Sequence, residues 1–220
     1  MMANGYVLSP KSKSYHALDS FVYEYINCGG TKDNLKIEIN YMLRCHVLPV
    51  ARREVRLPWN EEKLTVFSVA PLEIFASKTV ALLTRTAPRD LYGMHNMVKF
   101  GLFDESEEAM LRKCVVFYSA IGSAQPPEKF ALDNIGNVSF RQIKRDLNSV
   151  LRKGERFDLE FVQKEVKDYL TSVLVPTKEE KLFWKAFSEG NYYPDWVFGD
   201  SDESVSYTHL RAHETSAHLV

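Results

Sequence analysis

The densest group of polar side chains in the sequence lies in the segment LEIFASKTVALLTRTAPRDLYG. Lys78 and Arg85 are seven residues apart, so they share one face of a helix, and most apolar side chains of the segment fall on the opposite face. Arg89 and Asp90 follow Pro88, which favours the first turn of a second helix, where free N–H groups and the helix dipole stabilise an acid. Two cations closed by an acid could hold the phosphates of a nucleoside triphosphate. The same pattern also fits an ordinary solvated cationic face.

A glutamate occupies the polar face of a predicted strand in the segment LKIEINYML. Apolar and polar residues alternate there, which is typical of a half-buried strand, and Glu38 stands between Lys36 and Asn40 on the polar side. Because Mg²⁺ prefers oxygen ligands such as carboxylates, Glu38 could contribute to a metal site. An exposed strand glutamate with no ligand is the alternative that the residues leave open.

Other motifs lack the context that their chemistry requires. Gly29 and Gly30 form a turn outside any phosphate-loop pattern, and the acids at positions 200 and 202 lie in a predicted linker. His209 and His213 lie in VSYTHLRAHET, a stretch that resembles a translated sequencing adapter, so we expect no metal site there. The three cysteines are widely spaced and match neither a disulfide framework nor a zinc motif.

Composition places the chain among ordinary globular proteins, with 45% hydrophobic and 26% charged residues. The formal net charge of −1 gives no overall sign of a nucleic-acid-binding protein, although a local basic face is compatible with it. No apolar run approaches the roughly 18 residues that a membrane span needs, and the first residues do not form a signal peptide. We therefore expect a cytoplasmic protein that does not enter a membrane.

The elements that must position these residues are predicted to be a small sheet followed by helices, so the expected fold class is α+β. Apolar spacing predicts a helix over 12–26, and alternation predicts strands over 35–47, 53–57 and 64–69. Prolines and cap-like pairs predict helix starts, giving helices over 71–85, 88–100, 104–122, 139–152, 158–173 and 177–189. The predicted organisation is a sheet-containing domain over 1–70, a helical subdomain over 71–192, an acidic linker over 193–204 and a non-native tail over 205–220.

The segment VAPLEIFASKTVALLTRTAPRDLYGMHNMVKFGLF resembles the characteristic block of the AbiEii/AbiGii toxin-type nucleotidyltransferases, whose pattern is roughly PLEIxAxKxxALLxRxxxRDLYD. Two upstream segments, SPKSKSYHALDSFVYEYIN and DNLKIEINYMLRCHVLP, resemble one branch of the same family. The resemblance covers about residues 6–120, and the later helices match more loosely. Gly93 departs from the pattern, because an aspartate usually occupies that position.

The resemblance implies a polymerase-β-like nucleotidyltransferase core, of which residues 1–70 form a part. In such a core, Mg²⁺ ions held by carboxylates align the phosphates of an NTP with an attacking hydroxyl and stabilise the leaving pyrophosphate. By the family's pattern, Lys78 and Asp90 are the expected catalytic residues, Lys78, Arg85 and Arg89 bind phosphate, and Glu38 binds metal. The expected acceptor is the end of a tRNA, and the expected partner is a cognate antitoxin in a type IV-like toxin–antitoxin or abortive-infection system for phage defence.

The family's first motif, a Gly-Gly/Ser turn followed by a Ser-Asp-x-Asp strand, is not found in this sequence. We therefore expect the chain to be a fragment that lacks two of three metal carboxylates and is inactive. We also expect Glu38, Lys78 and Asp90 to converge on one cleft. The alternative is a non-catalytic remnant or interaction module, in which the helices of 104–189 bind a partner protein or an RNA backbone.

Overall fold

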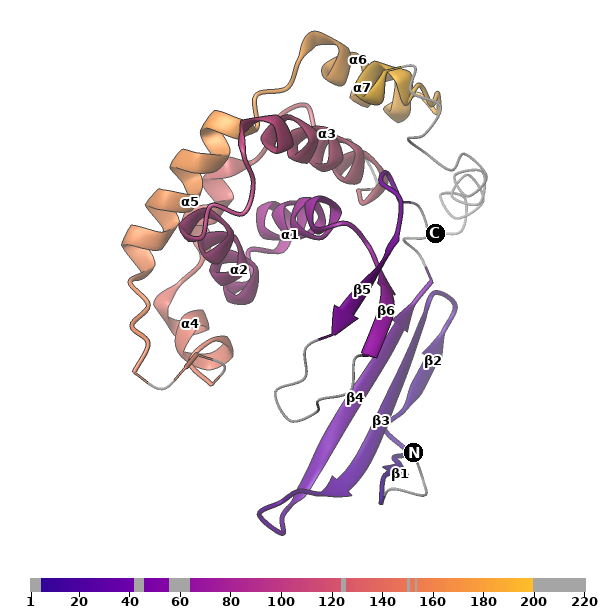
Figure 1. Ribbon diagram of the computed structural model, residues 1–220, viewed down its shortest axis with the longest axis vertical. Helices are drawn as coiled ribbons and strands as arrows, with labels where there is room; N and C mark the ends of the chain where they lie inside the picture. The colour runs from indigo at the N-terminus through magenta and orange to yellow at the C-terminus, as the bar shows by residue number, and fades with distance from the viewer. Residues whose placement is uncertain are drawn as a thin grey trace. The chain divides into compact units, whose positions relative to one another are not determined.

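The structure, a computed structural model, describes residues 5–41, 46–55, 64–123, 126–149, 151–152 and 154–199 (Figure 1). The predicted tail over 205–220 lies outside the described residues. The chain divides into two units, Met1–Cys45 and His46–Val220, called here the sheet unit and the helical unit. Each is described by itself.

The sheet unit is built around one long central strand. It contains β1 (Val7–Leu8), β2 (Lys13–Tyr15), β3 (Leu18–Ile26) and β4 (Lys32–Asn40), all antiparallel. On one edge, β3 pairs with β4 along its whole length, with Leu18 opposite Asn40 at one end and Ile26 opposite Lys32 at the other. On its other edge, β3 pairs with β1 and β2. Asn27 closes the β3–β4 hairpin, because its side-chain Oδ1 accepts hydrogen bonds from the backbone N–H groups of Gly29 and Thr31.

The prediction of a helix over 12–26 is wrong, because this segment forms β2 and β3. Its apolar residues fit helical spacing, but FVYEYI consists mainly of aromatic and β-branched residues, which suit a pleated strand better. The turn after Ile26 then brings β4 alongside, so that the whole of β3 gains ladder hydrogen bonds. The strand predicted over 35–47 is confirmed over 35–40, within β4, and residues 42–45 of that range lie outside the described residues. The prediction that this strand is half-buried is wrong for the described structure, because β4 is exposed along almost its whole length.

The helical unit begins with a hairpin of β5 (Ala51–Val55) and β6 (Leu64–Ser68), which overlaps the two short strands that the sequence predicts. The helices that follow are α1 (Pro71–Arg85), α2 (Pro88–Lys99), α3 (Glu105–Ile121), α4 (Phe140–Asp146), α5 (Leu159–Val173), α6 (Lys178–Ser188) and α7 (Asp195–Phe198), with a 3-10 helix at Leu132–Asn137. Helix α1 packs against α2 and α3, α2 packs against α4 and α5, and α3 packs against α6.

Most helix starts agree with the predicted ones. Proline is the first residue of both α1 and α2. Reciprocal capping boxes open α3, α4 and α6 from Asp104, Ser139 and Thr177. The helix predicted over 139–152 ends earlier, at Asp146. The range predicted as a linker contains α7, whose Val197 and Phe198 are buried, so the packed helices continue to that point.

The apolar core belongs to the helical unit. Leu82 of α1, Leu91 and Met94 of α2, and Phe117 of α3 are all fully buried. The helices that carry the predicted phosphate-binding residues are therefore fixed by packing. Among the described helices, none combines the length and the apolar character needed to cross a bilayer.

Candidate functional site

The turn between α1 and α2 brings an arginine and an aspartate together. Thr86 adopts a left-handed backbone conformation (φ 51°, ψ 44°), and its N–H donates to the Leu82 carbonyl. The chain reverses there, so Arg85 at the end of α1 meets Asp90 in the first turn of α2. The Arg85 Nε lies 2.8 Å from Asp90 Oδ2, and Nη2 lies 3.0 Å from Oδ1. This is a bidentate ion pair.

The two partners of this pair differ in exposure. The Asp90 side chain is 4% exposed and that of Arg85 is 66% exposed. The hydrogen bond to Asp90 raises the pKa of the Arg85 guanidinium, so its charge is permanent. A guanidinium has five N–H donors, and Asp90 takes two of them, so three are available to a ligand. Asp90 therefore holds Arg85 in one orientation.

Lys78 lies two turns before Arg85 on α1 and is half-buried. Its side chain runs along α2 at Gly93, where an added Cβ would lie 3.8 Å from Lys78 Cδ and 3.9 Å from Nζ. No hydrogen bond or ion pair joins the Lys78 ammonium to any residue that the structure describes. Lys78 is therefore a half-buried cation that pairs with none of the described residues, on the same helix as the ordered Arg85, and such cations suit an anionic ligand.

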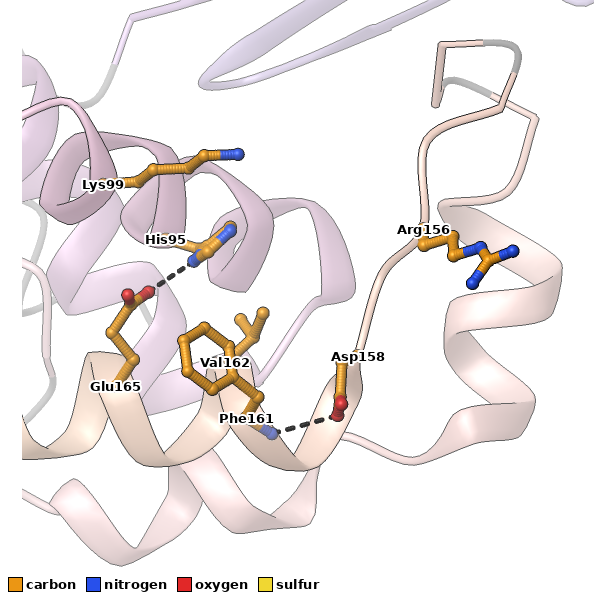
Figure 2. Close-up of a pocket in the computed structure, with 7 residues that line it drawn as sticks. All are labelled: His95, Lys99, Arg156, Asp158, Phe161, Val162 and Glu165. Atoms are coloured by element: carbon orange, nitrogen blue, oxygen red, sulfur yellow. Dashed lines mark hydrogen bonds and ion pairs between the residues drawn. The ribbon is translucent and has the colours of Figure 1, made fainter.

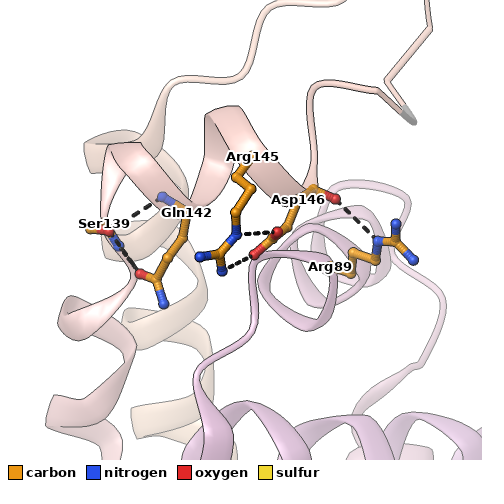
Figure 3. Close-up of polar contacts among 5 residues, drawn as sticks. All are labelled: Arg89, Ser139, Gln142, Arg145 and Asp146. Atoms are coloured by element: carbon orange, nitrogen blue, oxygen red, sulfur yellow. Dashed lines mark hydrogen bonds and ion pairs between the residues drawn. The ribbon is translucent and has the colours of Figure 1, made fainter.

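Arg89, the other predicted phosphate-binding residue, points to a different neighbour. It is exposed, and its Nε donates to the backbone carbonyl of Asp146, the last residue of α4, at 3.1 Å (Figure 3). The Asp146 carboxylate is itself paired with Arg145, and this hydrogen bond lowers the pKa of Asp146. Arg89 therefore joins the α1–α2 turn to α4.

Glu38 lies on β4 in the sheet unit, whereas Lys78 and Asp90 lie in the helical unit. The Glu38 carboxylate is 2.7 Å from Lys36 Nζ, and both side chains are about half exposed. The predicted convergence of Glu38 with Lys78 and Asp90 stays a prediction. Among the described residues, no three His, Cys, Asp or Glu side chains gather into a possible metal site. The described chain therefore offers Glu38 as a single carboxylate ligand, not a complete Mg²⁺ site.

A buried glutamate in α1 was not predicted to be important. Glu73 is 2% exposed, and its Oε1 accepts hydrogen bonds of 2.6 Å from the Val47 N–H and from the Tyr118 hydroxyl. Its Oε2 is buried and has no hydrogen-bond partner within the described part of the chain. Its place on the apolar face of a predicted helix was a signal that the sequence contained. Glu73 ties α1 to α3 and to the segment before β5.

A pocket of about 330 Å³ lies between α2 and α5 (Figure 2). His95 Nδ1 is 2.5 Å from Glu165 Oε2 at its wall, and Phe161 and Val162 add apolar surface. Asp158 lines it as well, but its carboxylate caps α5 through the Phe161 N–H. The sequence contains no spacing that would pair His95 with Glu165, because the two residues lie on helices far apart in the chain.

Comparison with protein families gives one match. The family model described as nucleotidyl transferase AbiEii toxin, type IV TA system, matches residues 9–181. That range includes the strand with Glu38 and both helices of the α1–α2 site. Searches of curated proteins and of solved structures found no match.

Proposed function

Because the chain belongs to the AbiEii family of nucleotidyltransferase toxins of type IV toxin–antitoxin systems, we propose for it the transfer of a nucleotide from an NTP to an acceptor hydroxyl at the end of a tRNA. The expectation that this chain is inactive, because the family's first motif is not found in it, stays a prediction that an assay of the wild-type chain tests. The observation that supports the proposed transfer most is that Lys78, whose ammonium pairs with none of the described residues, shares helix α1 with Arg85, whose guanidinium Asp90 holds in place. Transfer of this kind releases pyrophosphate, so cations that neutralise the phosphates accelerate it.

We assign the three residues of the α1–α2 site different tasks. Lys78 acts as a point charge on the phosphates of the NTP, and Arg85 contributes N–H donors that Asp90 does not use. Asp90 is a positioning residue, since it contacts Arg85 through two hydrogen bonds. Both carboxylate oxygens of Asp90 are engaged by Arg85, so we assign Asp90 a role that acts through that arginine.

Glu38 is the proposed Mg²⁺ ligand of this chain. Mg²⁺ is commonly bound through one or two carboxylates together with substrate phosphates and water, so one glutamate is compatible with a shared site. The ion would supply charge stabilisation at the phosphates. The carboxylate of Glu38 is paired with the Lys36 ammonium, so a bound cation would take the place of that ion pair.

The biological setting follows from the family. A type IV toxin acts with a cognate antitoxin protein, and we propose that this chain has such a partner. Modification of tRNA would stop protein synthesis, which would limit phage multiplication in an abortive-infection response. The reaction would take place in the cytoplasm, where tRNA and NTPs are found.

Replacement of Lys78 by alanine tests the assignment. In a form of the protein that carries the family's first motif, we expect Lys78→Ala to lower transfer of labelled nucleotide to tRNA by at least a factor of 100. The midpoint of thermal unfolding should be nearly unchanged, because the ammonium contacts no described partner. Lys113→Ala, a half-buried lysine on α3, is the matched control. The same assay, repeated at increasing concentrations of MgCl₂, tests Glu38. Glu38→Gln should raise the MgCl₂ concentration at which transfer reaches half of its maximum. Transfer by Lys78→Ala at the wild-type rate would refute the role of Lys78.

A further inference from the structure

One short segment of the chain carries a local excess of positive charge. Residues 139–156 contain six Lys or Arg residues and two acidic ones, although the whole chain has a net charge of −1. The segment consists of α4 and the residues that lead from it towards α5. Local concentration of one sign of charge creates a surface potential that the net charge conceals.

Three of these cations lie on the outer face of α4. Arg141, Lys144 and Arg145 are spaced at i, i+3 and i+4, and all three are exposed. On the inner side, Ile143 and Leu147 are 2% and 0% exposed, so they anchor the helix to the core. Because the helix is anchored, its outer face is a fixed arrangement of cations.

Two of the three cations of α4 have no polar partner among the described residues. Arg141 and Lys144 make no hydrogen bond or ion pair with the residues that the structure describes, and the printed contacts of Arg145 go only to the adjacent Asp146. Phe140, at the start of the helix, is 68% exposed. We define Phe140, Arg141, Lys144 and Arg145 as the α4 face.

The α4 face is directly connected to the α1–α2 site. Arg89 Nε donates to the Asp146 carbonyl at the end of α4, and the next residue, Asp90, holds Arg85 (Figure 3). Helix α4 is therefore fixed to the start of α2, where Asp90 holds Arg85.

We propose that the α4 face binds the phosphate backbone of the RNA acceptor in a single-stranded region. Lysine and arginine side chains neutralise successive phosphates, and an exposed aromatic ring offers a surface on which an unstacked base can stack. The choice of RNA rests on the proposed transfer reaction. Duplex nucleic acid fits less well, because its bases are already stacked and cannot use Phe140.

The test measures binding of a fluorescent 12-nucleotide RNA to the full chain by anisotropy, without NTP, between 50 and 200 mM salt. In the triple variant Arg141→Gln, Lys144→Gln, Arg145→Gln we expect affinity at 50 mM salt to fall at least tenfold. The slope of log affinity against log salt should become shallower by roughly 2, since each phosphate contact on a single strand contributes about 0.7. Phe140→Ala should weaken binding by about fivefold or more through lost stacking.

The matched control carries the same change of charge on another helix. Lys178, Lys181 and Lys185 of α6 are exposed, and their replacement by glutamine should leave RNA affinity within twofold of wild type. Equal losses in the two triple variants would overturn the proposal, as would a wild-type chain that binds no RNA at 50 mM salt. Equal binding of a duplex, or displacement of most RNA by an equal concentration of single-stranded DNA, would overturn the assignment to single-stranded RNA.

Failure of this inference is distinguishable from failure of the proposed function. Lys78→Ala should bind RNA as wild type does, because Lys78 is not part of the α4 face. RNA binding without nucleotide transfer would refute the proposed function alone. Transfer that persists while the α4 triple variant binds RNA like wild type would refute this inference alone.

Discussion

The two units of this protein are stabilised by different interactions. Every apolar residue that is buried in the described structure lies at or after Val47, in the helical unit. In the sheet unit, the buried residues among those described are Ser9 and Ser20, and β4 is exposed along almost its whole length. The helical unit has a side-chain core, whereas the described sheet unit is held mainly by its backbone ladder.

This difference shows where charged side chains can serve a function without a loss of folding stability. In the helical unit the core fixes α1, α2 and α4, so charged residues on their outer faces need no role in stability. Lys78, Arg141 and Lys144 make no polar contacts within the described chain, which is compatible with a role in binding. Glu38, in the sheet unit, stands on a strand whose position depends on pairing with β3.

The largest effect that we predict tests the contrast between the units directly. Phe117 is fully buried in α3, and Phe21 on β3 is half-buried. Phe117→Ala should lower the free energy of unfolding of the helical unit by about 3–5 kcal/mol, because it removes a large side chain and leaves a cavity. Phe21→Ala should cost roughly 1 kcal/mol, through lost cross-strand packing. Urea unfolding followed by circular dichroism measures both, and similar losses would contradict the contrast.

A smaller and asymmetric effect is expected at the Arg85–Asp90 pair. Arg85→Ala leaves the buried Asp90 carboxylate without its partner, so we expect a loss of about 2–3 kcal/mol in unfolding free energy. Asp90→Ala should cost only about 1 kcal/mol, because water can solvate the exposed Arg85. Both variants should reduce nucleotide transfer. A double-mutant cycle, measured by chemical denaturation, gives the coupling free energy between the two side chains. If Asp90→Ala lowered the unfolding free energy more than Arg85→Ala does, the expectation that the buried Asp90 needs Arg85 as its partner would be wrong.

The smallest effect concerns the pH dependence of stability, and it compares Cys114 in the helical unit with Cys28 in the sheet unit. Burial, helped by the Glu73 carboxylate, raises the pKa of the Cys114 thiol from 9.0 to about 12. Between these values the unfolded chain loses the proton and the folded chain keeps it, so stability falls as pH rises. This thiol should lower the unfolding free energy by roughly 0.7 kcal/mol between pH 8.5 and 9.5.

Two variants check this prediction by urea unfolding at the two pH values. Cys114→Ala should remove that part of the pH dependence, and Cys28→Ala, which changes an exposed thiol of the sheet unit, should leave it intact. If Cys114→Ala lost as much unfolding free energy between the two pH values as the wild-type chain does, groups other than Cys114 would cause that fall.

Much of the fold was predictable because its signals are local. Pro71 and Pro88 mark helix starts through their fixed φ angle, and Ser139 with Gln142 forms a cap within four residues. The segment 12–26 was not predictable in this way. Its spacing suits a helix, and the pairing of β3 with β4, which decides its structure, is not visible in the segment itself.

For the candidate site too, local signals were predictable from the sequence and tertiary contacts were not. By itself, the sequence determined which charged residues are present, that Lys78 and Arg85 share a helix face, and that the segment around them belongs to a nucleotidyltransferase toxin family. The tertiary structure decided the partners: Asp90 holds Arg85, Arg89 reaches α4, and Glu73 of α1 is buried against Tyr118 of α3. Spacing along a chain fixes direction about one helix axis, but an ion pair or a buried carboxylate depends on which other helix packs against that face, and only the assembled core sets that choice.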